Sequence, residues 1–355
     1  MLEIAVCQKK LRDFFEIVAA GQSPLYEAVC RRMVDDAELL EIMRQTPLGQ
    51  PGPNLFLAAV HFLLLQGAEH ELRQFYGTCV ADPRPAAEAW PAFRSFCFTH
   101  REQLIPLLQT GRVQTNEVRR CSYLFPAFSL VHRQQPDRPL AIIEIGTSAG
   151  LNLNWDRYAY DYGGHGKFGS AASQVVIQSE WRGKDGQLPN KLPPVVHRVG
   201  IDLHPVDVND PRQAHWLQSL LWPDQPERFA LQRAAIEEFR RGPVMLVAGN
   251  ALEVLPIEIA QAPVAANLCI LHCHTLNQFS ESERAALMQI FQAASHERCI
   301  HVLSAEWIKT PQTELRLATW QRGECVSSLL AEVDHHGRWI DWRGGRPPGL
   351  PVIAS

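Results

Sequence analysis

The sequence predicts an α/β protein in which an all-helical N-terminal region precedes a mostly parallel sheet that ends in an antiparallel hairpin. Three observations predict this class. Apolar residues recur every three or four positions through residues 1–135. From Leu140 onward, short β-rich runs alternate with helical segments, and residues 323–344 alternate on both sides of His335. A polar segment, Gln-Gln-Pro-Asp-Arg-Pro, separates the two patterns, so we expect domains of residues 1–135 and 136–355.

The composition is that of an ordinary globular protein and narrows the possible functions. Of the 355 residues, 46% are hydrophobic and 20% are charged, and the net charge is only −4. No global field would therefore attract nucleic acid or an anionic membrane. The richest apolar stretch, residues 55–65, is too short to span a bilayer, and the N-terminus lacks the pattern of a signal peptide. We expect a cytoplasmic protein whose nine cysteines form no disulfides.

The N-terminal region is expected to contain a series of helices. The first follows from the spacing of Leu2, Val6 and Leu11. Turn signals rich in glycine and proline separate it from four further helical stretches. These are predicted over residues 23–43, 54–76, 85–108 and 116–133.

The C-terminal region is expected to form a Rossmann-like sheet with helices on both faces. Its strands are predicted over residues 140–146, 195–203, 243–249, 267–273 and 299–307. Helices are predicted over residues 151–158, 215–221, 226–239 and 282–294. Residues 162–194 are rich in glycine and proline, and we interpret them as an insertion that carries one hairpin within residues 173–181. The closing hairpin is expected at the edge of the sheet.

The turn after the first predicted strand is the most informative motif. Gly146 and Gly150 lie four residues apart at the carboxyl end of that strand, where open α/β sheets bind their ligands. A dinucleotide motif needs a different glycine spacing, and a phosphate-binding loop needs a lysine that this turn lacks. Two chemistries remain, which are acyl hydrolysis and the binding of a nucleoside that carries no phosphate.

Acyl hydrolysis is suggested by residues 146–150, which read Gly-Thr-Ser-Ala-Gly and match the elbow that presents a nucleophilic serine, here Ser148. The string resembles the patatin-like lipases. Those enzymes also carry a glycine-rich oxyanion loop upstream and an Asp-Gly-Gly motif, whereas this chain has isolated glycines before Leu140 and only a loose counterpart at Asp161. Helices rather than strands precede the elbow. A serine acyl hydrolase is therefore an alternative function.

Binding of a nucleoside is indicated by three short motifs, which follow the first three predicted strands in order. Glu144, Gly146 and Gly150 resemble the first motif of class I S-adenosylmethionine-dependent methyltransferases. This resemblance implies that the glycines admit the methionine half of the cofactor and that the acid helps to hold its ammonium group. The second predicted strand ends in Gly-Ile-Asp-Leu, residues 200–203, where Asp202 can accept hydrogen bonds from both ribose hydroxyls.

The third string, Gly-Asn-Ala at residues 249–251, follows the third predicted strand and resembles the Gly-Asp-Ala with which methyltransferases read adenine. Asn250 replaces the usual aspartate, but its amide oxygen can still accept a hydrogen bond. The interval from Gly146 to Asp202 exceeds 50 residues, where about 20 are usual, so the insertion must leave the sheet and return. The expected cofactor contacts are Glu144, Gly146, Thr147, Ser148, Gly150, Asn152, Asp202, Leu203, Asn250 and Ala251.

Longer strings resemble one bacterial family, the domain-of-unknown-function family 2332. They extend over most of the chain and comprise residues 115–120 (TNEVRR), 148–153 (SAGLNL), 156–160 (DRYAY), 200–203 (GIDL) with Pro205, 216–217 (WL) and 221–223 (LWP). The resemblance implies a methyltransferase-like fold behind a helical N-terminal region. It implies no particular substrate.

Methyl transfer requires alignment of the acceptor and, for a weak nucleophile, a base. His272 and His274 are two residues apart at the end of the fourth predicted strand, so they are expected to point to one face. They are the candidate bases, with Glu117 as a further catalytic candidate. Alternatively, the two histidines form hydrogen bonds with nearby backbone groups and have no catalytic role. No metal site is expected, because neighbouring strand residues point to opposite faces. His335 and His336 are interpreted as part of a solvated turn.

Three residues are candidates for binding the substrate. They are Thr115, Asn116 and Tyr158. Alternatively, Thr115 or Asn116 caps the helix that follows and does not bind the substrate. Asn152 and Asp156 are expected to share one face of the first helix.

The sequence thus predicts S-adenosylmethionine-dependent methyl transfer to a small metabolite, in a site at the strand ends between the helical region and the sheet. One alternative is a hydrolase that uses Ser148. The other is a non-catalytic protein that binds the cofactor, and the replacement of the usual aspartate by Asn250 favours this alternative. The partner is expected to be a small molecule, with no nucleic acid and no membrane. The acceptor and the oligomeric state are not indicated.

Overall fold

The computed structural model describes residues 3–183, 188–189, 191–307 and 312–344. The chain forms two compact units, one of Met1–Thr115 with Asp207–Arg233 and the other of Asn116–Val206 with Ala234–Ser355. The division falls at Thr115 rather than at residue 135, because the helix over residues 121–134 packs against the strands of the second unit. Residues 207–233 return to the first unit after the strand over residues 195–202.

The first unit is helical, as its apolar periodicity predicts, and its described residues contain no strand. Its elements are α1 (Ile4–Asp13), η1 (Phe14–Val18), α2 (Pro24–Met33), α3 (Ala37–Met43), α4 (Gly52–Leu65), η2 (Glu71–Phe75), η3 (Ala86–Glu88), α5 (Ala89–Thr99), α6 (Arg101–Thr110) and α8 (Pro211–Ser219). The helix α9 (Pro226–Arg241) begins in this unit and ends in the second. The apolar side chains of α4 point in every direction, and the helix is accordingly buried among the others.

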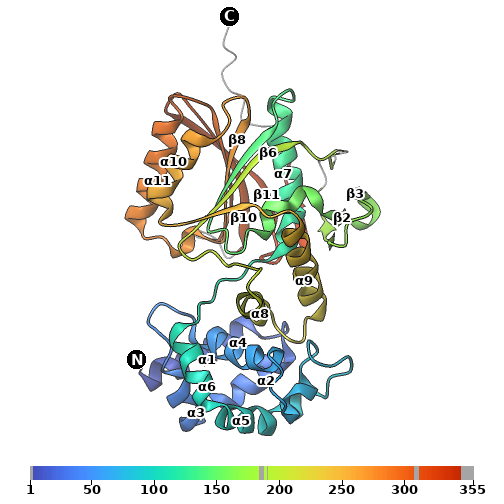
Figure 1. Cartoon of the computed structure of the whole chain (residues 1–355), viewed down its shortest axis with the longest axis vertical. Coiled ribbons are helices and arrows are strands. Elements are labelled where there is room, and N and C mark those ends of the chain that lie inside the picture. Colours follow the sequence, from blue (N-terminus) through green and yellow to red (C-terminus); the bar gives the residue numbers. More distant parts are fainter. Residues whose placement is uncertain (1–2, 184–187, 190, 308–311, 345–355) are drawn as a thin grey trace, which may run out of the picture. The chain divides into compact units, whose positions relative to one another are not determined.

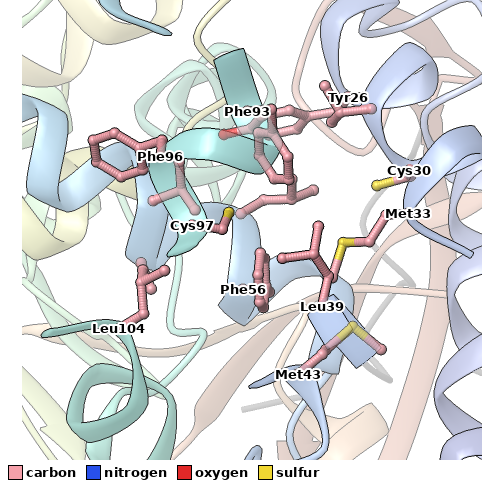
Figure 2. Close-up of a cluster of buried hydrophobic side chains, with 14 of the residues drawn as sticks. Tyr26, Cys30, Met33, Leu39, Met43, Phe56, Phe93, Phe96, Cys97 and Leu104 are labelled. Atoms are coloured by element: carbon pink, nitrogen blue, oxygen red, sulfur yellow. The ribbon is translucent and has the colours of Figure 1, made fainter. Parts of the chain in front are cut away.

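The core of the first unit joins all of its main helices. Aromatic, aliphatic and sulfur-containing side chains from α2, α3, α4, α5 and α6 interdigitate there (Figure 2). Trp216 and Trp222 from the returning segment pack against the same cluster. This core explains why residues 207–233 belong to the first unit.

The second unit is built on a nine-stranded sheet. Its strands are β1 (Leu140–Ile145), β5 (Glu180–Trp181), β6 (Val195–Asp202), β7 (Met245–Ala248), β8 (Asn267–Cys273), β9 (Ile300–Glu306), β10 (Thr313–Gln321), β11 (Glu324–Val333) and β12 (Trp339–Trp342), in the spatial order β5-β12-β11-β10-β9-β8-β1-β6-β7. A separate small sheet contains β2 (Ala159–Asp161), β3 (Lys167–Gly169) and β4 (Val176–Gln178). The helices are η4 (Val118–Arg120), α7 (Cys121–Gln134), η5 (Leu151–Arg157), η6 (Gly163–His165), α10 (Ala251–Gln261), η7 (Leu276–Gln278) and α11 (Glu281–Ala294).

The parallel part of the sheet reverses its strand order beside β1. The strands β7, β6, β1, β8 and β9 are neighbours in that order and pair in parallel. The chain proceeds from β1 outward to β6 and β7, then returns to β8 on the other side of β1. In open α/β sheets such a switch point marks the usual ligand site, at the carboxyl ends of the strands.

Helices cover both faces of this sheet (Figure 1). On one face, Ala141, Ile143 and Ile145 of β1 pack in a buried cluster with α10 and α11. Because successive residues of a strand point to opposite faces, Leu140, Ile142 and Glu144 point to the face of α7. An ionisable side chain thus stands at the carboxyl end of an otherwise apolar strand.

The sequence prediction missed the helix α10 and the strand β10, as well as β2 and β3 of the small sheet. The helix α10 contains Pro256, which reads as a helix breaker. The strand β10 pairs with β11 across Arg322 and Gly323, which both have positive φ, as a two-residue hairpin turn requires. The predicted closing hairpin is present as β11 and β12, but β5 lies outside β12.

Two local predictions were wrong. Residues 173–181 form no hairpin, because β4 pairs with β2 in the small sheet while β5 pairs with β12 in the large one. Residues 151–157 form 3-10 helix with a kink at Asn154, so Asn152 and Asp156 do not share a face as they would in an α-helix. Asp156 instead forms a two-pronged ion pair with Arg198 of β6, at 2.7 and 3.0 Å.

In the described part of the chain, no helix combines the length and apolarity that crossing a membrane requires. All nine cysteines are free thiols.

Candidate functional site

The turn between β1 and η5 lies at the switch point and has an unusual backbone. Gly146 and Gly150 both adopt φ of 72°, and Ser148 between them adopts φ of 55°. The left-handed region is open to glycine but strained for serine. The peptide N–H groups of Gly146 and Thr147 donate to the Ile201 carbonyl, which attaches the turn to β6.

Both glycines are also required by close packing. A Cβ atom at Gly146 would lie 2.3 Å from the Thr275 hydroxyl oxygen, and one at Gly150 would lie 2.8 Å from a methyl group of Leu246. Their presence is therefore explained by the turn itself, whether or not a ligand approaches it. Thr275 follows β8, so this packing also joins the ends of β1 and β8.

Glu144 is buried at the end of β1, with 2% of its surface exposed. Its carboxylate accepts a hydrogen bond from the Thr147 hydroxyl at 2.6 Å and one from the Asn152 amide at 3.4 Å. Burial raises the pKa of Glu144 to about 7, although both hydrogen bonds oppose that shift. The residue is therefore poised to change its charge near neutral pH, as functional carboxyl groups often are.

Asp202 and Asn250 end the two strands beyond β1. In the sheet, Glu144 pairs with Gly200 and Asp202 pairs with Ala248, so the three polar residues lie at the carboxyl ends of three adjacent strands. The carboxylate of Asp202 accepts from the backbone N–H of Ser148 and of His204, both at 2.9 Å. The side-chain oxygen of Asn250 caps α10 by accepting from Leu252 at 3.0 Å. Asp202 therefore supports the glycine turn and Asn250 supports the start of α10, whatever else they bind.

The remaining predicted cofactor residues differ in exposure. Leu203 is 64% exposed beside Asp202, and Ala251 is buried as the first residue of α10. Asn152 accepts a hydrogen bond from the Cys121 thiol at 3.4 Å while it donates to Glu144. The structure therefore brings Glu144, Thr147 and Asn152 into direct contact.

The predicted substrate residues have different positions. Asn116 accepts a hydrogen bond from the backbone N–H of Leu151 at 3.0 Å and so holds the end of the glycine turn. Tyr158 is buried, and its hydroxyl donates to the Leu151 carbonyl at 2.6 Å. Thr115 is exposed and is the last residue of the first unit. The helix cap is Glu117, which accepts from Arg119 N–H, rather than Thr115 or Asn116.

The two candidate bases have separate partners. His272 lies within β8, and its Nδ1 is 2.9 Å from Oε1 of Glu306 at the end of β9. That same oxygen accepts from the backbone N–H of Thr275 and of Leu276, at 3.1 and 3.2 Å. A carboxylate bound to Nδ1 fixes the orientation of an imidazole and leaves Nε2 as its basic nitrogen. Glu306 was not among the site residues predicted from the sequence.

His274 lies beyond the end of β8 with φ of 56°, so the alternation that would place it beside His272 no longer applies. Its Nε2 is 3.3 Å from the Thr313 hydroxyl, which is 2.7 Å from Nδ1 of His335. Burial lowers the pKa of His274 far below its usual range, with further contributions from Arg120 and the neighbouring histidines. It is therefore a weaker base than an ordinary histidine.

The interpretation of His335 and His336 as a solvated turn was wrong. Both are only partly exposed, and Nδ1 of His336 is 3.6 Å from the carboxylate of Glu117. The neighbouring Gly337 carbonyl accepts hydrogen bonds from the hydroxyls of Ser122 and Ser179. The turn between β11 and β12 is thus partly buried and packs against η4 and the start of α7.

Arg120 is the buried cation of this region. It is 8% exposed, and its Nε donates to the His335 carbonyl at 3.1 Å. Burial opposes its charge, but the acidic groups of Cys273, Tyr123, Glu117 and Glu306 together raise the pKa of Arg120. Arg120 lies in the string Thr-Asn-Glu-Val-Arg-Arg, yet the sequence analysis assigned it no role.

Two buried thiols complete the cluster. The Cys273 sulfur lies 3.2 Å from the Tyr123 hydroxyl, and burial raises the pKa of Cys273 to about 11. Burial also raises the pKa of Cys121 well above its usual value. Both thiols remain protonated at neutral pH, so neither is an activated nucleophile. Within the described ranges, no group of three or more His, Cys, Asp or Glu side chains is arranged to hold a metal ion.

The fold and the site together define a mixed α/β protein whose buried ionisable side chains gather at the switch point of a mostly parallel sheet. Residues 8–342 match the family described as "Uncharacterized protein conserved in bacteria (DUF2332)", and the chain belongs to that family. No curated protein matches the sequence significantly.

Proposed function

We propose that this protein binds S-adenosylmethionine and transfers its methyl group to a small-molecule acceptor. One observation carries the proposal: Glu144, Asp202 and Asn250 lie at the carboxyl ends of three adjacent parallel strands, β1, β6 and β7, beside the point where the strand order reverses. The order β7-β6-β1-β8-β9 and the antiparallel strand after β9 are compatible with a Rossmann-like methyltransferase sheet. Nucleosides bind such sheets at this position.

The charges of the site suit this cofactor better than a phosphorylated one. Glu117, Glu144 and Glu306 are buried, and Arg120 is the buried cation among them. An excess of carboxylates disfavours phosphate groups and favours a ligand with positive charge. The turn is followed by the seven residues of η5, which include no lysine. S-adenosylmethionine carries a sulfonium and an ammonium group and no phosphate.

Each part of the cofactor has a candidate partner. Asp202 is the candidate for the ribose hydroxyls, and Asn250 with the exposed Leu203 for the adenine. Glu144 provides negative charge near the amino-acid end and the sulfonium. When bound, the cofactor supplies a methyl group on a positively charged sulfur. His272, oriented by Glu306, is the candidate to remove a proton from the acceptor.

Titration calorimetry with S-adenosylmethionine and S-adenosylhomocysteine tests this function. We expect a dissociation constant below 1 mM for each, on the order of ordinary enzyme ligands. Asp202→Asn should weaken both by about 10-fold or more, because it removes a charged acceptor. The control Asp341→Asn removes a carboxylate from β12, near the opposite edge of the sheet, and should leave the affinity unchanged. No heat of binding at millimolar ligand would refute the proposal.

A serine acyl hydrolase is the second candidate, and the left-handed φ of Ser148 is the observation in its favour. Against it, Asp161 of the Asp-Tyr-Gly-Gly string lies in the small sheet and interacts with Lys167 at 3.2 Å and the Gly163 N–H at 2.9 Å. We therefore expect no labelling by a fluorophosphonate probe. Labelling that Ser148→Ala abolishes would establish the hydrolase instead.

A cofactor-binding protein without catalysis differs from the methyltransferase only in turnover. The capping role of Asn250, where methyltransferases usually carry aspartate, suits this alternative. Tight binding of S-adenosylmethionine with no homocysteine product across a panel of acceptors would favour it.

A further inference from the structure

Two buried polar groups of the site have unused hydrogen-bonding capacity. Arg120 is more than nine-tenths buried, and its one side-chain hydrogen bond in the described structure uses Nε. Guanidinium groups have five N–H donors, so four remain for another partner. Oε2 of Glu306 is also buried, and it accepts no hydrogen bond from the described residues. Buried polar groups in native proteins are rarely left unsatisfied.

The chain itself does not pair these two groups. No carboxylate in the described residues lies within 4 Å of the Arg120 nitrogens as an ion pair, although Glu117 and Glu306 influence its charge electrostatically. Arg120 donates to the His335 carbonyl, and the centroid of the His335 ring lies 6.0 Å from that of Trp307, which follows Glu306 in the chain. His335 therefore connects the surroundings of the two groups. Oε1 of Glu306 is held in place by His272 and by two backbone N–H groups. Glu306 is therefore held in place through Oε1, whereas Oε2 accepts no hydrogen bond from the described residues.

Glu144 differs from Glu306 in this respect. Thr147 donates to one of its oxygens and Asn152 donates to the other, so both oxygens have a partner. Of the two carboxylates that end β1 and β9, Glu306 is thus the one with an oxygen that lacks a described partner.

We propose that Arg120 and Glu306 form a binding site for an α-amino acid group, with the carboxylate of the ligand on Arg120 and its ammonium group on Glu306. An arginine fork matches a carboxylate through two parallel hydrogen bonds. An ammonium group supplies the donor that Oε2 of Glu306 lacks. A phosphate dianion fits less well, because the charges of three buried carboxylates, Glu117, Glu144 and Glu306, all act on Arg120.

Two ligands present this chemistry, the amino-acid end of S-adenosylmethionine and a free amino acid. The inference rests on the proposed function only for the first of these. A free amino acid could bind even if the protein used no nucleoside.

Calorimetry with three probes separates these sources. The probes are S-adenosylhomocysteine, 5′-methylthioadenosine, which is the same thioether nucleoside without the amino-acid group, and the standard free amino acids. If the cofactor is the source, the wild type should bind S-adenosylhomocysteine about 10- to 100-fold more tightly than methylthioadenosine. Arg120→Gln and Glu306→Gln should each remove most of that difference and leave methylthioadenosine binding unchanged.

Further variants keep the test decisive. Arg120→Lys retains the charge without the fork and should lose part of the difference, which provides a result if Arg120→Gln fails to fold. Arg343→Gln removes an arginine with half of its side chain exposed and serves as the matched control. If no nucleoside binds but an amino acid binds in a manner that depends on Arg120, the inference stands and the proposed function fails. It is overturned if Arg120→Gln binds every probe like the wild type, or if the wild type binds neither S-adenosylhomocysteine nor any amino acid.

Discussion

Replacement of Glu144 by glutamine should stabilise the folded protein at pH 8 by about 2–3 kcal/mol. The pKa of this buried carboxyl group is raised from 4.5 to about 7, chiefly by burial. At about 1.4 kcal/mol for each tenfold change in proton affinity, the ionised group destabilises the fold by about 3 kcal/mol. Glutamine has the same shape and no charge, so the variant avoids this destabilisation.

The direction of the pH dependence follows from the raised pKa. Below pH 4.5 the group is protonated in both the folded and the unfolded protein. Between pH 4.5 and about 7 the unfolded chain loses this proton while the folded protein keeps it, so the contribution of Glu144 to stability falls as the pH rises. The wild type should therefore lose stability over this interval relative to the variant.

Urea denaturation of both proteins at several pH values between 4.5 and 8 measures this difference. The exposed Glu324→Gln serves as control and should follow the wild type at every pH. If the variant is no more stable than the wild type at pH 8, the ionised form of Glu144 does not destabilise the fold, and the prediction is wrong.

Glu144→Gln should also weaken S-adenosylmethionine binding at pH 8 by about 10-fold, because it removes negative charge beside a cationic ligand. A gain in stability combined with a loss of binding is typical of functional residues. If stability rises and affinity does not change, the environment of Glu144 is as described but its role in binding is refuted.

Gly337→Ala should destabilise the second unit by about 3 kcal/mol. Gly337 has φ of 76°, which is unfavourable for alanine by roughly 1–2 kcal/mol. The added Cβ atom would also lie 2.4 Å from the carbonyl oxygen of Arg119 and 3.1 Å from the backbone nitrogen of Arg120. Because both contacts are with backbone, neither can be relieved by rotating a side chain.

The same substitution should disturb the proposed amino-acid site. Movement of the turn would break the hydrogen bonds that the Gly337 carbonyl accepts from Ser122 and Ser179, and it would shift the His335 carbonyl that holds Arg120. We therefore expect loss of the preference for S-adenosylhomocysteine over methylthioadenosine.

Gly163→Ala is the matched control for this prediction. Gly163 has φ of 60°, but an added Cβ atom would meet no atom within 4 Å. The control should lose only the roughly 1–2 kcal/mol of the backbone term. Equal urea midpoints for the two variants would mean that the turn moves away from Arg119 without difficulty.

The sequence alone predicted the order of elements well, because that order depends on local patterns. Each parallel strand is a short apolar run followed by a turn, and the helices of the first unit follow from apolar spacing. The end of the first unit at Thr115 was not predictable in this way, because it depends on which strands α7 packs against.

The candidate site was predicted only in part. Glu144, Thr147, Asn152 and Asp202 all lie within or beside one short turn and its neighbouring strand, so their proximity follows from the parallel order of β1 and β6. Tyr158 was chosen from a string, and the structure shows its hydroxyl bonded to the main chain. Local spacing cannot reveal whether the hydrogen bonds of a side chain are already satisfied within the fold.

What the sequence by itself determined is therefore the α/β class, the glycine turn and the acids that follow the first two parallel strands. The tertiary structure alone decided that Glu306 orients His272, that His335 and His336 are packed against η4, and that Arg120 is buried with one side-chain hydrogen bond to the described residues. Arg120 and the carbonyl it binds are 215 residues apart. Such a contact arises from the folding of distant segments, and no periodicity or motif in either segment records it.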